Sequence, residues 1–139
     1  MVAFSRDIGN SGSIYFEING DTHHLAYRFD SETNQKEQWY SLSHLSHIVG
    51  VNHANQRRES RHVFHLATKN VKSKGNKGNI ARIVDLCLIR RDDVLRWLEK
   101  IAKKKDNLSP DKRANLEYLI NNLQELDALV WKSSKQQSS

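Results

Sequence analysis

The chain has 139 residues with a single cysteine, and 37% of its residues are hydrophobic, including three Trp, four Tyr and four Phe. This length suits one domain with a single core, and the aromatic content excludes a wholly disordered chain. A lone cysteine excludes an intramolecular disulfide and suits a reducing compartment. Because no apolar run approaches membrane-spanning length and no secretory signal is recognisable, we expect a cytoplasmic protein without a membrane partner.

The positive charge lies in the middle of the chain. Residues 57–105 contain 15 Lys or Arg and 5 Asp or Glu, a net charge of +10, whereas residues 1–56 and 106–139 are mildly acidic. A localised basic region of this kind indicates a polyanionic or acidic partner rather than a charged tail that aids solubility.

A β-hairpin is predicted over residues 13–29, because apolar and polar residues alternate before Asn19-Gly20, a pair typical of tight turns. A polar loop over 30–37 and a short strand over 38–40 are expected to follow.

The next segment has the outline of a helix-turn-helix. Apolar residues recur at helical spacing from Ser41 to Gly50, a residue suited to a helix C-terminal cap, and a second short helix is predicted over 53–62. Arg and Gln side chains match the edges of guanine and adenine. The predicted contact residues of the second helix are Gln56, Arg57, Arg58 and Arg61.

Residues 69–79 are rich in Lys, Gly, Asn and Ser, and we expect an exposed basic loop there. The flanking segments 63–66 and 80–88 are predicted to be strands that pair as a basic hairpin. Flexible lysines can contact phosphates or an acidic surface without reading sequence. The predicted contacts in the loop are Lys69, Lys72, Lys74 and Lys77.

Two C-terminal helices are predicted. The first covers 92–105, and the second begins at Pro110 and ends near Trp131. Apolar residues of the second helix step by three and four, which favours either packing within the domain or a homodimer seam through 110–131. These residues are Leu116, Leu119, Leu123, Leu126 and Val130. The expected fold is one α+β domain over 1–131, followed by a disordered polar tail over 132–139.

The sequence gives little support for catalysis. Cys87 lies in an apolar run and is predicted to be an inert core thiol. Two His-x-x-His pairs, His44 with His47 and His62 with His65, have no accompanying cysteine pair, and no phosphate-binding loop is present. We therefore expect a non-enzymatic protein without a metal or cofactor.

A series of spaced residues and short motifs extends over about residues 38–131. They are Trp39, Gly50-Val51, Ala54 to Arg58, Leu86 to Ile89, Arg96-Trp97-Leu98, Ser109-Pro110 and Leu129-Val130-Trp131. This series resembles the N-terminal domain of lambdoid-phage antirepressors. More remotely, the order of strands and helix is similar to the N-terminal domain of baculovirus-repeated-ORF proteins.

The resemblance implies a phage or prophage regulator in the bacterial cytoplasm that relieves repression by binding a repressor, or a DNA-binding module of such a regulator. Two departures leave an alternative open. His53 stands where members of the family commonly carry Trp, and many of them continue into a second domain beyond the position of Trp131. The alternative is a small phage-encoded inhibitor that binds a host defence protein or nucleoprotein complex.

Overall fold

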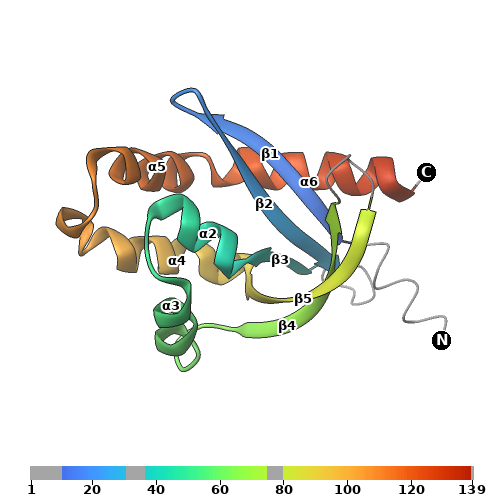
Figure 1. The fold of residues 1–139 in the computed structure, drawn as a ribbon, viewed down its shortest axis with the longest axis horizontal. Coiled ribbons are helices and arrows are strands. Elements are labelled where there is room, and N and C mark those ends of the chain that lie inside the picture. The colour runs from blue at the N-terminus through green and yellow to red at the C-terminus, as the bar shows by residue number, and fades with distance from the viewer. Residues whose placement is uncertain (1–10, 31–36, 75–79, 139) are drawn as a thin grey trace.

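The computed structural model describes residues 11–30, 37–74 and 80–138, with the backbone alone at positions 30, 37, 70, 72–74, 80–84 and 133–138. This part of the chain forms an antiparallel sheet with helices packed against one face, which confirms the α+β fold (Figure 1). The strands are β1 (Ser11–Ile18), β2 (Asp21–Asp30), β3 (Glu37–Ser41), β4 (Leu66–Lys74) and β5 (Ile80–Arg90). The helices are α2 (Leu42–Val49), α3 (His53–Ser60), α4 (Arg91–Ala102), the 3-10 turn η1 (Lys105–Asn107), α5 (Pro110–Asn121) and α6 (Leu123–Ser138).

The predicted N-terminal hairpin is present as β1 and β2, paired from Ser11 opposite Arg28 to Ile18 opposite Asp21. Asn19 and Gly20 form the turn with φ values of 52° and 89°. These are the residue types that adopt positive φ at the lowest cost, so the local sequence is sufficient to define the turn.

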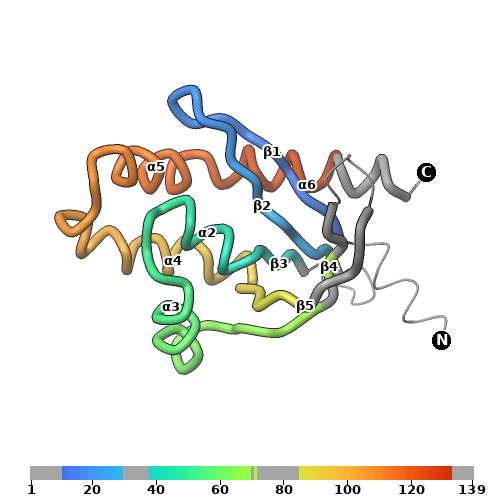
Figure 2. The backbone as a smooth tube through the Cα atoms, in the orientation of Figure 1, coloured from blue at the N-terminus to red at the C-terminus, as the bar shows by residue number. Residues whose placement is uncertain are grey.

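The sheet has the order β1-β2-β3-β5-β4, and it curls so that its two outermost strands, β1 and β4, also come close together. One face packs against the helices in the main core. The other face encloses a smaller apolar cluster of Ala26, Trp39, Val71 and Leu88. Figure 2 shows α4 and the α5–α6 pair running in opposite directions along the sheet.

The predicted helix-turn-helix-like pair is present as α2 and α3. The Ser41 hydroxyl accepts a hydrogen bond from the His44 amide at 3.2 Å and caps α2. Gly50 ends α2 at φ 76°, and a Cβ atom there would lie 2.7 Å from Cγ of Lys112. Both the backbone conformation and the close neighbour therefore favour glycine between the two helices.

The sequence predicts an exposed loop over residues 69–79, but strand β4 covers the first part of this segment. Strand β4 begins at Leu66 and continues to Lys74, and β5 begins at Ile80, so Lys69, Lys72 and Lys74 lie in a strand. The long apolar strand β5 lies opposite every residue of β4 in an antiparallel ladder, and this pairing outweighs the weak strand propensity of Lys, Asn and Ser.

The single helix predicted from Pro110 to Trp131 is in fact two helices, α5 and α6, divided at Asn122. The Asn122 side chain donates to the Tyr118 carbonyl at 2.8 Å and so competes for an acceptor of the helix backbone. Helix α6 then continues to Ser138, through residues that we expected to be disordered. No Gly or Pro interrupts this segment, so the helix can propagate from its packed first turns.

The apolar seam of these helices packs inside the domain. Every one of its five residues is buried in the main core, which they share with α2, α4 and the sheet. The interpretation of this seam as packing within the domain is therefore confirmed, and its five residues leave no free apolar surface for the homodimer seam that was the alternative. These residues are Leu116, Leu119, Leu123, Leu126 and Val130.

A polar network joins β3, α4 and α6 at the edge of this core. The Asp127 carboxylate accepts a hydrogen bond from the Tyr40 hydroxyl at 2.6 Å and from Nε of Arg91 at 2.7 Å to each oxygen. Burial and the neighbouring carboxylate raise the pKa of Tyr40, so its hydroxyl remains a donor. The network fixes the position of α6 relative to the sheet.

Candidate nucleic-acid interface

Helix α3 is short and polar, and it lies at the surface next to α2. It begins at Asn52, whose side chain accepts a hydrogen bond from the Asn55 amide at 2.9 Å. The buried residues of α3 are Gln56 and Ser60, one turn apart. The helix therefore has an inner side and an outer side, and the outer side carries the exposed arginines Arg57, Arg58 and, directly after the helix, Arg61.

Gln56 does not belong to the outer side. Its side chain is 8% exposed, and its Oε1 accepts a hydrogen bond at 3.0 Å from Nε1 of Trp97, which is fully buried. The prediction that Gln56 contacts a partner is wrong, because the buried indole N–H requires this acceptor.

Replacing Gln56 by alanine is expected to lower the free energy of unfolding by about 1–2 kcal/mol, because the Trp97 donor would be left buried without a partner. Urea denaturation followed by Trp fluorescence measures the change. The same substitution at Gln124, which is exposed on α6, is the control and should stay within about 0.5 kcal/mol of the parent. Equal stability of the two variants would contradict the assigned role.

The arginines of α3 differ in their pairing from Arg90 and from the arginines of α4. In the described residues, no carboxylate forms an ion pair with Arg57, Arg58 or Arg61, and Arg58 donates to the neutral Asn55 side chain at 2.8 Å. Arg90, the last residue of β5, and both arginines of α4 each have a carboxylate partner. Those pairs are Arg90 with Asp92 at 3.6 Å, Arg91 with Asp127 at 2.7 Å and Arg96 with Asp93 at 3.4 Å.

A depression of about 210 Å³ lies between α3 and the neighbouring part of the sheet. Arg57 and Arg61, which are four residues apart and so lie on the same side of the helix, line it from α3. Thr68 of β4 and Cys87 of β5 are register partners and line it from the sheet, beside Leu66.

Cys87 was predicted to be an inert core thiol, but it is half-buried and lines this depression. Burial raises the pKa of its thiol, and the two positive charges of Arg57 and Arg61 partly oppose that rise. The apolar run around Cys87 gave no indication of this position, because it depends on how β4 pairs with β5.

Of the four lysines predicted in the loop, Lys69 is the one whose side chain is described, and the structure does not bring it together with these arginines. Nζ of Lys69 lies 5.1 Å from the centre of the Trp39 ring. Lys69 neighbours Thr68 in β4, so it belongs to the other face of the sheet. The side chains of Lys72 and Lys74, and all of Lys77, lie outside the described residues.

Comparison with known proteins finds no matching family model, curated protein or solved structure. Within residues 11–30, 37–74 and 80–138, no helix is both long enough and apolar enough to cross a membrane.

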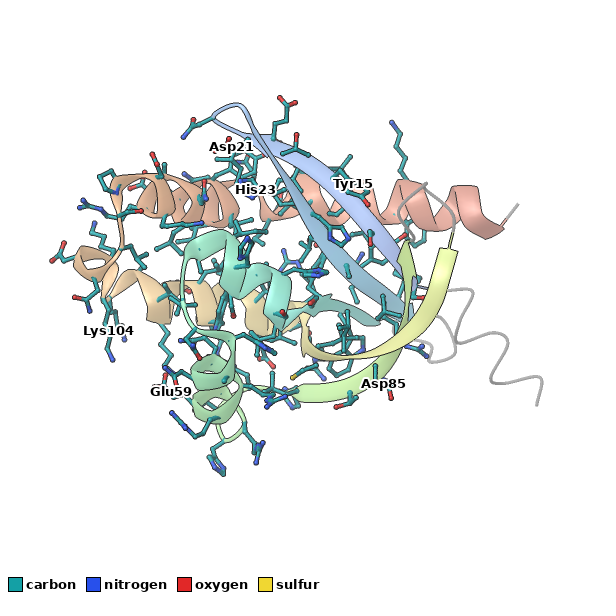
Figure 3. The ribbon with its side chains drawn as sticks, viewed as in Figure 1. Tyr15, Asp21, His23, Glu59, Asp85 and Lys104 are labelled. Carbon is teal, nitrogen blue, oxygen red and sulfur yellow. The ribbon has the colours of Figure 1, made fainter. Side chains whose placement is uncertain are left out.

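A second basic group lies directly after the C-terminal end of α4, where Lys103, Lys104 and Lys105 are exposed. Figure 3 shows Lys104 at this end of the molecule and Glu59 on α3. A groove of about 170 Å³ lies between the two helices, and the Glu59 carboxylate, 3.7 Å from Nζ of Lys100, lines it. The negative charge makes this groove less suited to an anion than the depression beside Arg57.

One histidine of the predicted His-x-x-His pairs, His65, has a structural partner in α4. The His65 amide donates to Oδ2 of Asp93 at 2.8 Å, and Nδ1 of the same histidine lies 2.9 Å from that oxygen. Burial opposes ionisation of Asp93, but the hydrogen bonds from His65 outweigh it and lower the pKa of the carboxyl. In the part of the chain that the structure describes, no three His, Cys, Asp or Glu side chains are grouped to hold a metal ion.

Proposed function

We propose that this protein is a phage or prophage regulator of the antirepressor type, which acts without catalysis by binding DNA through the outer side of α3. The observation that carries the proposal is the group of Arg57, Arg58 and Arg61, three exposed arginines without a carboxylate partner among the described residues. Neighbouring like charges repel one another in the free protein, and phosphates would relieve that repulsion.

The arrangement of α2 and α3 supports DNA as the partner. Helix α2 is anchored in the core, and a link of three residues, 50–52, leads to the exposed helix α3. This is how helix-turn-helix proteins present their second helix to the major groove. Arginine forks match both phosphate oxygens and guanine edges, which is why DNA is favoured over an acidic repressor surface.

The resemblance to antirepressor N-terminal domains, over about residues 38–131, supports the regulatory part of the proposal and the proposed location in the bacterial cytoplasm. A DNA-binding module fits one of the two roles that the resemblance implies. Capture of a repressor is the other role that the resemblance implies, and capture of a host defence complex is the separate alternative. Both are outcomes of the experiment that follows.

The test is binding to random-sequence duplex DNA, titrated over a range of salt concentrations. Replacing Arg57, Arg58 and Arg61 together by glutamine should reduce the slope of log K against log salt by about 3, since each lost phosphate contact removes roughly one unit. Far-UV circular dichroism verifies that the variant is folded.

The matched control replaces Lys103, Lys104 and Lys105 by glutamine, which removes the same charge at the far end of α4. Its slope should change by less than about 1. Equal slopes for the two variants would mean that net charge rather than α3 determines binding. No binding of the parent protein at low salt would overturn the proposal, and capture of repressors or defence complexes would be tested next.

A further inference from the structure

The depression beside α3 has a chemical character that goes beyond general positive charge. Its polar side chains are two guanidinium groups, a hydroxyl and a thiol, contributed by Arg57, Arg61, Thr68 and Cys87. Each of them can donate a hydrogen bond. Among the described residues, those that line it include no carboxylate, and Asp85 is not one of them. Asp85, which Figure 3 labels, lies two residues before Cys87 on β5.

The two arginines are arranged to act together. Arg57 and Arg61 are one helical turn apart, both line the depression, and neither forms an ion pair within the described residues. A guanidinium group offers a planar fork of donors that matches two oxygens of one anion. Two such forks over a neutral floor favour an anion with more than two acceptor oxygens.

We infer that this depression is a phosphate-binding site, in which Arg57 and Arg61 hold the phosphate oxygens and Thr68 donates from the sheet. The inference rests on the proposed function in taking the phosphate to be that of DNA. A phosphodiester of the backbone and a terminal phosphate share the same oxygens, and the experiment separates these two sources. The depression would hold one phosphate in a fixed place and so define the position of α3 on the duplex.

Cys87 allows occupancy of this site to be measured directly. It is the single cysteine of the chain, and it lies in the depression. A bound phosphate would shield the thiol and disfavour its thiolate, so alkylation by N-ethylmaleimide should slow. When nine-tenths of the molecules are occupied, the rate should fall about tenfold. The probes are inorganic phosphate, compared with sodium chloride at equal ionic strength, and duplex DNA with 5′-hydroxyl or 5′-phosphate ends.

Three double variants test whether the protection of Cys87 from alkylation depends on Arg57 and Arg61. In the double variant Arg57→Gln with Arg61→Gln, the ratio of alkylation rates without and with phosphate should fall to about 1. In Lys103→Gln with Lys105→Gln, which removes the same charge elsewhere, it should stay as in the parent. Arg57→Lys with Arg61→Lys keeps the charge without the forks and should give an intermediate ratio. Alkylation in urea gives the rate for unfolded protein, against which each variant is compared.

The outcomes separate this inference from the proposed function. DNA binding with unchanged Cys87 alkylation would overturn the phosphate site and leave DNA binding in place. Protection by inorganic phosphate without DNA binding would support the site and overturn the proposed function. Protection by both duplexes would identify a backbone phosphate, and protection by the 5′-phosphate duplex alone a terminal one. No DNA binding at low salt, together with no protection of Cys87 by phosphate, would overturn both.

Discussion

Replacing Asp127 by alanine is expected to lower the free energy of unfolding by about 3 kcal/mol, because two donors lose their acceptor at once. The Tyr40 side chain is 1% exposed, so its hydroxyl cannot recover a hydrogen bond from water without local opening. Arg91 would keep its charge in a partly buried position after losing both short contacts from its Nε.

Urea denaturation of the Asp127→Ala variant measures the loss. The control is Asp92→Ala, which removes a carboxylate 3.6 Å from Arg90 on a side chain that is 79% exposed. Exposed pairs contribute little, so the control should lose less than about 1 kcal/mol. If Asp127→Ala were no more destabilising than this control, the network would not be what holds α6 against β3 and α4.

Acid is expected to destabilise the protein through His44. Burial, followed by the nearby His24, His47 and His53, lowers the pKa of His44 from 6.5 to about 4. Its Nδ1 accepts a hydrogen bond at 2.9 Å from the Ala26 amide, so protonation at this nitrogen would break the contact. The folded state therefore binds fewer protons than the unfolded state, and the stabilisation is complete above pH 6.5.

As the pH falls from 6.5 to 4, this group should reduce the free energy of unfolding by about 2–3 kcal/mol, allowing for its partial exposure. His44→Gln is the matched variant, since its amide can still accept from Ala26 but does not titrate. Urea denaturation at a series of pH values should show a shallower loss of stability for His44→Gln than for the parent. Parallel pH profiles would assign the acid sensitivity to other groups.

The parts of the fold predicted from the sequence are those with local determinants. Asn19-Gly20 defines a turn by its own conformational preferences, and Ser41 and Gly50 cap α2 within one turn of the helix. The Ser109 cap of α5 is likewise present, with its hydroxyl accepting from the Lys112 amide at 3.3 Å. In each case the two partners of the interaction lie within a few positions of each other in the sequence.

The parts that could not be predicted depend on distant residues. From the local sequence, Gln56 is predicted to be an exposed polar residue. It is buried, and it accepts a hydrogen bond from Trp97, which is 41 positions later in the chain. The length of β4 follows from its pairing with β5, and the setting of Cys87 follows from the same register. The arginines of α3 were predicted from the helix-turn-helix outline. The depression could not be predicted, because it forms only when the sheet brings Thr68 and Cys87 to one side.

The position of α6 against β1 has a consequence for synthesis on the ribosome. These elements come from opposite ends of the described chain, yet they lie side by side and share one core. The part of β1 that packs on α6 therefore stays uncovered until α6 has left the exit tunnel. Because contacts between remote residues form late, the domain should acquire its native packing only after α6 has emerged from the ribosome. Until then, the nascent strands would rely on chaperones to keep them from associating with other chains.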